Sequence, residues 1–301
     1  IQFGYDESHL ETVVEKKGII FQIDMHLKKN SPKGIAIDKV PIRRASELFG
    51  IVHFVFFSPE DLNIIKNGPG ERRRFLDSEL CQLDGVYITE LASYNHIVNQ
   101  RNRLLKDCYM NPGLKSTLDI WDMQMADYGK KIIEKREEFV EELNELAKGL
   151  HKGLTGGLEE LEILYEPSVT AAEFEQKLAQ NRDRDLRMKL TSVGPHRDDF
   201  CVKVNGIDIR KYGSQGQQRT AALSLKLSEI YLVKKKIKDT PVLLLDDVLS
   251  ELDSKRQEHL LSEITHIQTL ITCTGLDEFV NSKFRMDKIF KIVEGTVESE
   301  D

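Results

Sequence analysis

The sequence has few cysteines and no long hydrophobic run, and both absences exclude functions. The four cysteines among 301 residues lie far apart and form no Cys-x-x-Cys pair. This argues against a zinc site or a dithiol redox motif and fits a reducing compartment. The most apolar stretch, residues 51–57, is interrupted by His53 and is far shorter than the ~18 residues of a membrane span. No signal peptide is visible either, so we expect a cytoplasmic protein without membrane contact.

Basic residues are outnumbered by acidic ones. Lys and Arg total 43 against 50 Asp and Glu, which gives a formal net charge of −7 and a pI near 5.7. A protein whose whole surface coats nucleic acid would have a pI above roughly 9. Any DNA contact must therefore use a local basic face. The length suggests two domains of ~150 residues each.

Strand patterns open the chain. Residues 19–27 alternate apolar and polar side chains, which predicts a strand. Residues 34–40 are predicted to form a second strand that pairs with it across a Ser-Pro turn. Residues 51–57 form a near-continuous apolar run, which is typical of a strand buried on both faces. Ser58 is predicted to cap a helix that has Pro59 at its first position.

A helical stretch follows, and strands return after it. Between residues 83 and 150, apolar side chains recur at helical spacing on both sides of a Pro-Gly turn, which predicts two long antiparallel helices. A third helix is predicted from Thr170, as its N-cap, to Leu190. The later predicted elements are a hairpin around Asn205–Gly206, helix 215–236, strand 242–245, helix 254–264, strand 269–274 and strand 289–293. We therefore expect an α/β body, residues 1–77 and 191–301, split by a helical arm at 78–190.

Two adjacent carboxylates, Asp246 and Asp247, follow the apolar strand 242–245. Ligands of open α/β sheets bind at the carboxyl ends of the strands. Acids at that place are costly to keep ionised unless a cation or hydrogen bonds compensate, and a magnesium–nucleotide complex supplies such compensation. The alternative is a strand that ends in a solvated Asp-Asp turn.

The start of the helix at residue 215 is a second candidate site. Its first residues leave unpaired backbone N–H groups and a partial positive charge, which together bind anions. These residues are Ser214, Gln215, Gly216 and Gln217. A Gly-Ser loop before a helix is also ordinary capping, so this motif alone leaves both interpretations open.

In combination these motifs resemble a known family. Ser-x-Gly-Gln at 214–217, the Asp-Asp pair about 30 residues later and Ser-Glu-Leu-Asp at 250–253 resemble the signature motif, Walker B and D-loop of an ABC-type ATPase head. With GPGERRRFLD (68–77) and TSVGPHRDDF (191–200), the sequence is similar to the RecF family of bacterial recombination mediators, which are related to SMC proteins. The resemblance runs from about residue 19 to about residue 295. It implies an α/β fold, namely an ABC-type ATPase head (a P-loop NTPase-like mixed sheet with helices) plus a helical arm.

The resemblance also implies roles for single residues. Asp246 would hold Mg²⁺ through water, and Asp247 would orient or activate the attacking water. Ser250 would lie at the dimer interface. The residues that would reach ATP held by a partner subunit are Ser214, Gln215, Gly216, Gln217 and Asp253.

The implied function is an ATP-switched DNA-binding protein of recombinational repair. Family members are expected to dimerise with ATP on single- and double-stranded DNA and to hydrolyse ATP slowly. The implied partners are RecR, RecO and, indirectly, RecA, which would be loaded at gaps and would permit the SOS response. Two alternatives stay open: the ATP-binding subunit of an ABC transporter, and an SMC-like structural protein without an ATP cycle.

The sequence departs from the family pattern in three places. No Gly-x-x-x-x-Gly-Lys-Ser/Thr phosphate loop occurs. Because Ile1 is not a natural start, we expect that a segment with this loop is missing and that these 301 residues are a folded monomer with little affinity for ATP. After strand 269–273 the sequence reads Thr274–Gly275 without the usual His, which predicts slow turnover. No glutamine precedes Ser58, where a Q-loop residue is expected.

DNA contacts are harder to place. Basic clusters around Arg101, Lys130 and Lys234 can bind phosphates or can be solvated helix faces. The GPGERRR and GPHRDD motifs can serve DNA, the nucleotide or a domain contact. The residues of these motifs that we take as DNA or interface candidates are Arg72, Arg73, Arg74, His196 and Arg197.

Overall fold

A three-stranded parallel sheet forms the centre of the head. The computed structural model describes residues 1–273 and 286–300, and its central strands are, in spatial order, β10 (Thr269–Thr272), β9 (Val242–Asp246) and β5 (Phe54–Phe57). Leu243 of β9 pairs with Thr269 on one side and with Val55 on the other. The predicted parallel sheet is therefore confirmed, whereas the position at Thr274–Gly275 lies outside the described residues.

Helices pack against one face of this sheet. Val55 and Phe57 are buried in a core shared with α7 (Gln215–Ile237) and α8 (Ser254–Glu263). Phe54 and Phe56 point to the other face and are 39% and 48% exposed. The expectation that this strand is buried on both faces is wrong, because no described helix covers the face of Phe54 and Phe56.

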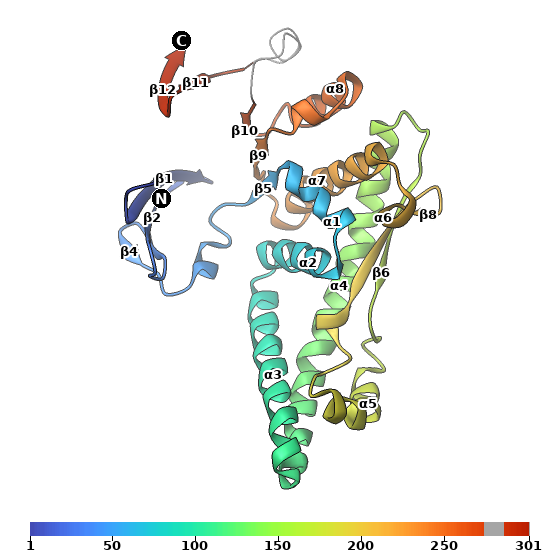
Figure 1. The fold of residues 1–301 in the computed structure, drawn as a ribbon. Coiled ribbons are helices and arrows are strands. Elements are labelled where there is room, and N and C mark those ends of the chain that lie inside the picture. Colours follow the sequence, from blue (N-terminus) through green and yellow to red (C-terminus); the bar gives the residue numbers. More distant parts are fainter. Residues whose placement is uncertain (274–285, 301) are drawn as a thin grey trace.

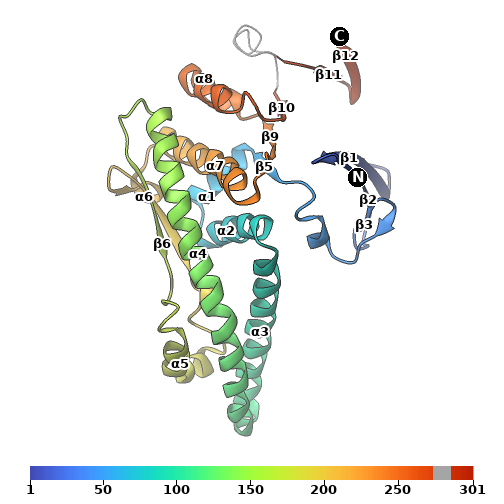
Figure 2. The same cartoon turned by 180° about the vertical axis from the view of Figure 1, so that it is seen from behind.

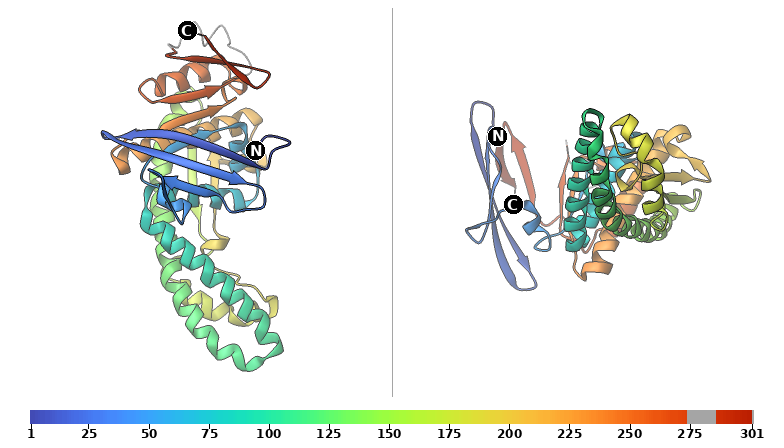
Figure 3. Two further views of the ribbon diagram at one scale, coloured as in Figure 1. Left: turned by 90° about the vertical axis from the view of Figure 1, so that its left-hand side faces the viewer. Right: turned by 90° about the horizontal axis from the view of Figure 1, so that it is seen from below.

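An antiparallel sheet near the N-terminus lies apart from the central one (Figure 3). Its strands are, in spatial order, β1 (Glu7–Lys16), β2 (Ile19–Lys28), β3 (Gly34–Ile37) and β4 (Val40–Pro41). β2 and β3 confirm the predicted strand pair, while β1 has no counterpart among the predicted elements. Leu10 and Val13 of β1 are exposed, so β1 lacks the one-sided burial that makes a strand recognisable.

The arm is an antiparallel pair of long helices, as predicted. α3 (Gly85–Met110) and α4 (Leu118–Leu154) run side by side away from the head, with α5 (Phe174–Met188) beside their distal half (Figures 1 and 2). α4 ends just before Gly156 and Gly157, which both have positive φ. Leu154 is buried in the core of the central sheet, so α4 reaches from the arm into the head.

A second small sheet ties the base of the arm to the head. β6 (Leu161–Glu166), absent from the predicted elements, pairs with β7 (Asp199–Val204). β7 and β8 (Ile207–Asp208) form the predicted hairpin. α2 (Pro69–Leu83) also runs through the proposed limit at residue 78. The division into a head and an arm at 78–190 therefore stays a proposal. α2 runs across its first limit, and β6, inside the arm range, pairs with β7, outside it.

The remaining elements are short. They are α1 (Leu62–Lys66), α6 (Ile209–Tyr212), β11 (Ile289–Val293) and β12 (Thr296–Glu300). Ser58 is the N-cap of a helix with Pro59 at its first position, as predicted, but this helix is a single 3-10 turn (Pro59–Asp61); the Ser58 N–H donates to Asp61 Oδ2 at 2.8 Å. The predicted helix after Thr170 begins only at Phe174, because Thr170 Oγ1 bonds Glu173 and closes a turn first. None of the helices in residues 1–273 and 286–300 is long and apolar enough to cross a membrane.

Candidate functional site: an acidic strand end and a capped helix start

The carboxyl end of β9 carries the two predicted acids. Asp246 is exposed, and its Oδ1 accepts a hydrogen bond from Thr272 Oγ1 of β10 at 2.5 Å. Asp247 has φ 52°, a left-handed conformation that is uncommon for a residue other than glycine. Its N–H donates to the Thr272 carbonyl at 3.1 Å, and its own carbonyl accepts from Ser250 Oγ at 2.9 Å. These bonds hold the two acids at the edge of the sheet.

One oxygen of this pair is left without a partner. Within the described residues, Asp247 Oδ1 is buried and has no hydrogen-bond partner. A buried carboxylate oxygen without a donor is costly, and a hydrated cation or a water relieves that cost. The described residues offer no group of three metal-ligating side chains. Mg²⁺ is commonly bound through one or two carboxylates, waters and substrate phosphates, and Asp246 and Asp247 are the carboxylates that would hold it here.

The start of α7 has the predicted cap. Ser214 Oγ accepts from the Gln217 N–H at 3.2 Å, and Gln217 Oε1 accepts from the Ser214 N–H at 3.0 Å, which is a reciprocal capping box. Ser214, Gln215 and Gly216 are exposed. The cap and the anion-site interpretations are thus compatible, because the capped turn still presents a helix N-terminus to solvent.

A hollow lies between the segment after β9 and the first turns of α7. It is also lined by the end of β5 and the start of α1. The lining residues are Phe57, Ser58, Pro59, Leu62, Arg219, Ala222, Val248 and Leu252. Neither the two acids nor Ser214 to Gln217 line it, so the hollow joins residues that follow the two motifs and not the motifs themselves.

Asp253 caps α8. Its Oδ1 accepts from the Arg256 N–H at 3.1 Å, and its carboxylate also pairs with the Arg256 side chain. The Arg256 backbone N–H is the main reason why the pKa of Asp253 lies below its ordinary value. The side chain is half exposed, as a residue at an interface between subunits would be in a free subunit.

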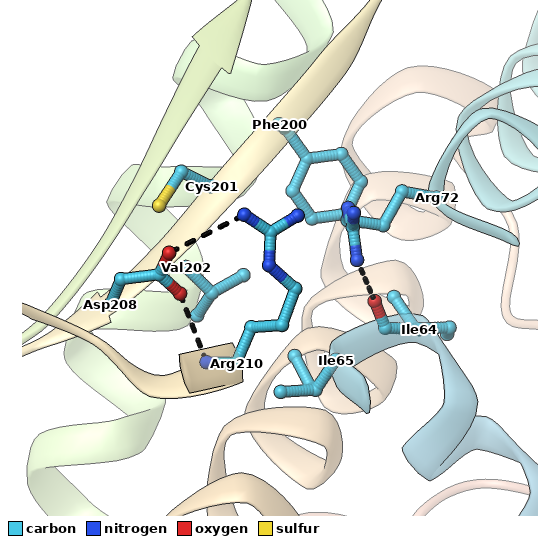
Figure 4. A pocket seen from close by; sticks show the side chains of 8 residues that line it. All are labelled: Ile64, Ile65, Arg72, Phe200, Cys201, Val202, Asp208 and Arg210. Atoms are coloured by element: carbon cyan, nitrogen blue, oxygen red, sulfur yellow. Dashed lines mark hydrogen bonds and ion pairs between the residues drawn. The ribbon is translucent and has the colours of Figure 1, made fainter. Parts of the chain in front are cut away.

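The structure removes Arg72 from the DNA candidates. Arg72 is 2% exposed, and its Nε and Nη2 form a bidentate pair with Asp199 at 2.5 and 3.0 Å. Its Nη1 donates to the carbonyls of Ile64 and Asn67, the former drawn in Figure 4 beside the Arg210–Asp208 pair. With its donors used inside the protein, Arg72 joins α2 to β7 and is not available for DNA.

The other four candidates separate into half-buried and exposed groups. Arg73 Nη1 donates to the Asp198 carbonyl at 2.7 Å, so it also serves the contact between α2 and the GPHRDD segment. His196 bonds Tyr94 and Thr191, which is a structural role. Arg74 and Arg197 are exposed and stay candidates for an interface. Arg101, in one of the basic clusters, is fully buried and pairs with Asp122 and Asp185, so it is not part of a DNA surface.

The sequence motifs did not disclose the residue at the centre of this contact. Arg136 of α4 is 1% exposed. It donates to Asp77 at 2.7 Å, the Pro195 carbonyl at 2.7 Å and Tyr87 at 3.1 Å, and lies 3.4 Å from Asp198. The signal that could have found it is its place in the apolar stripe of α4, between Ile132 and Phe139.

His196 makes the stability of the protein depend on pH. Burial, with the nearby Arg197 and Arg73, lowers the pKa of His196 from 6.5 to about 4. Between those values the unfolded chain binds a proton that the native state does not, so stability falls as pH falls from 6.5 to about 4. We expect a contribution of about 3 kcal/mol over the whole interval, of which about 2 kcal/mol falls between pH 7 and pH 5. Urea unfolding of wild type and His196→Gln at pH 7 and pH 5 measures it. Equal pH slopes in the two proteins would contradict this assignment.

Known proteins with similar sequences and folds identify the family of this chain. The fold is that of an ABC-type ATPase head; an SMC head solved with the winged-helix domain of ScpA shares it with a TM-score of 0.53 at 12% identity, over 98% of this chain and 73% of that one. The DNA replication and repair protein RecF of Agathobacter rectalis is 61% identical over 298 residues, which are 99% of this chain and 82% of that protein. The chain belongs to the RecF family of DNA replication and repair proteins.

A solved relative supports the same assignment. The structure described as the recombination mediator protein RecF-ATP in the RecFOR pathway has a TM-score of 0.89 at 34% identity, over 100% of this chain and 82% of that one. No family model matches the chain.

Proposed function

We propose that this protein is an ATP-switched DNA clamp of recombinational repair. ATP and Mg²⁺ close two copies around DNA near junctions of single and double strands, and slow hydrolysis releases them. The dimer works with RecO and RecR to load RecA at gaps, in the cytoplasm, and so supports the SOS response. The observation that carries the proposal is the Asp246–Asp247 strand end, where the buried Asp247 Oδ1 has no hydrogen-bond partner among the described residues.

The proposed residue roles are those that the resemblance to ATPase heads implies. Asp246 holds Mg²⁺ through its water shell, and Asp247 orients the attacking water. The start of α7, Ser214 to Gln217, binds the terminal phosphate of ATP held by the other copy, and Asp253 lies beside it. Bound Mg²⁺–ATP supplies the phosphoryl group and the charge that these residues position. Arg74 and Arg197 are the DNA or interface residues that remain.

A substitution of Ser214 by Arg tests the proposal. We expect Ser214→Arg to weaken ATP-dependent dimerisation about tenfold or more, because a bulky cation would occupy the anion site at a helix N-terminus. Sedimentation velocity with and without MgATP and gapped DNA measures the dimer. The chain is used with a preceding segment that carries a phosphate-binding loop, since residues 1–301 contain none.

Ser116→Arg is the matched control. Ser116 is exposed in the turn at the far end of the arm, so an arginine there leaves the dimer intact. A dimer that forms equally well in Ser214→Arg would remove α7 from the interface. Absence of any ATP-dependent shift in the unsubstituted protein would favour the structural protein without an ATP cycle.

A further inference from the structure

A series of hydrogen bonds leads from the exposed cap of α7, through Glu159, to the buried His151. Gln217 uses both ends of its side-chain amide: Oε1 accepts from the Ser214 N–H, and Nε2 donates to Glu159 Oε1 at 3.0 Å. Glu159 lies in the loop between α4 and β6, 58 residues away in the sequence. The orientation of the Gln217 amide therefore depends on a carboxylate from outside α7.

The same carboxylate reaches the arm helix. The second oxygen of Glu159, Oε2, lies 3.2 Å from His151 Nε2, in the last turn of α4. An ionised carboxylate only accepts, so the ring donates from Nε2. His151 is completely buried, and its Nδ1 lies 3.0 Å from Ser224 Oγ, two turns further along α7. Glu159 and His151 therefore connect two positions of α7, Gln217 and Ser224.

The end of α4 is fixed against three elements of the head. Leu154 is buried with the strands of the central sheet and with α7. Gly153 lies so close to the ring of His259 in α8 that a Cβ there would be 2.8 Å from it. The packing of the last turn of α4 on the head therefore sets the position of His151 relative to α7.

We propose that Glu159 is a positioning residue for the α7 motif: through Gln217 it holds Ser214 in the capped arrangement, and through His151 it makes that arrangement depend on the seating of the arm helix. The proposal rests on the proposed function, in which Ser214 to Gln217 bind the nucleotide of a second copy. Burial lowers the pKa of His151 below its ordinary value, which favours the neutral ring with its proton on Nε2, facing Glu159.

The first test needs no nucleotide. Hydrogen exchange of the backbone amides of Ser214 and Gln217 is measured in residues 1–301, for Glu159→Ala, Glu159→Gln and the control Glu160→Ala. We expect Glu159→Ala to speed exchange about tenfold, as for the loss of one hydrogen bond to a charged group, and Glu159→Gln to restore part of the protection because its carbonyl still accepts from Gln217. Glu160 is exposed and pairs with Lys148 instead, so its substitution leaves exchange unchanged.

The second test separates this proposal from the proposed function. With a preceding segment that carries a phosphate-binding loop added to the chain, Glu159→Ala is expected to raise the MgATP concentration for half-maximal dimerisation about tenfold, with Glu159→Gln between it and wild type. Exchange at Ser214 and Gln217 that is the same in Glu159→Ala and Glu160→Ala would overturn the positioning role, whatever the dimer does. Faster exchange in a protein that never dimerises would uphold the positioning of Ser214 and refute the clamp. A normal MgATP response in Glu159→Ala would overturn the link to the nucleotide site.

Discussion

Arg136→Met is expected to lower the free energy of unfolding by about 3–5 kcal/mol, because it breaks a buried ion pair and leaves its acidic partners uncompensated. Arg136 is buried and binds Asp77 of α2, Tyr87 of α3 and the 195–198 segment from its place on α4. Asp198 is fully buried as well, and it also accepts from Tyr165 and from the Ser168 N–H. Methionine fills much of the space but donates no hydrogen bond. The midpoint and slope of urea unfolding measure the loss.

Lys131→Met is the matched control for this prediction. It lies on the same helix, its side chain is 44% exposed, and it pairs with Asp127 one turn away. Exposed pairs of this kind contribute little, so we expect a change within about 0.5 kcal/mol. A loss below about 1 kcal/mol for Arg136→Met would mean that Asp77 and Asp198 find other partners and that the contact between arm and head does not depend on Arg136.

The elements with regular periodicity could be predicted from the sequence. The two arm helices, the α7 helix, the β7–β8 hairpin and the strand before Asp246 all stand where the pattern places them. The arm helices each have a buried apolar stripe and the hairpin has specific turn chemistry, whereas α7 is a long apolar helix buried on most sides. β1 and β6 could not be predicted in the same way. β1 exposes apolar side chains, and β6 is short and is defined by pairing with β7, 38 residues further along the chain.

The motif Arg72–Arg73–Arg74 does not by itself tell which of its arginines are buried. The three side chains lie about 100° apart around α2, so they meet three environments. Arg72 precedes Phe75 and Leu76 by three and four residues and shares their buried face, whereas the Arg74 side chain is 76% exposed. Helical spacing could have separated them. Their partners could not have been named, because Asp199 lies 127 residues from Arg72.

The candidate site was predictable only in part. The acids and the cap are local features of sequence, and both lie where expected. The Glu159–Gln217 bond joins segments that only the folded structure brings together, so no spacing rule discloses it.

Lys226→Met is the other substitution with a large expected effect, and its effect depends on pH. Lys226 of α7 is buried and lies 2.8 Å from Glu229 and 3.9 Å from Asp61, and Glu79 of α2 adjoins the same cluster. Burial raises the pKa of Glu79 from 4.5 to about 6, and burial and Glu79 raise that of Glu229 well above its ordinary range. Without the ammonium group, these acids lose their buried cation. We expect a loss of about 3–5 kcal/mol at pH 7.

Acid should rescue this variant. A carboxyl group whose native pKa exceeds its unfolded value binds its proton first in the native state, so stability rises as pH falls through that interval. For Glu79 the interval runs from about 6 down to 4.5 in the wild type, and removal of Lys226 moves its upper end higher. The loss at pH 5 is therefore smaller than at pH 7, and Glu79→Gln in the variant should restore stability at pH 7. Lys235→Met, on the exposed side of α7, is the control and changes stability within about 0.5 kcal/mol at both pH values. An equal loss at pH 5 and pH 7 for Lys226→Met would show that the cavity left by the side chain, and not the charge of Glu79 and Glu229, determines the cost.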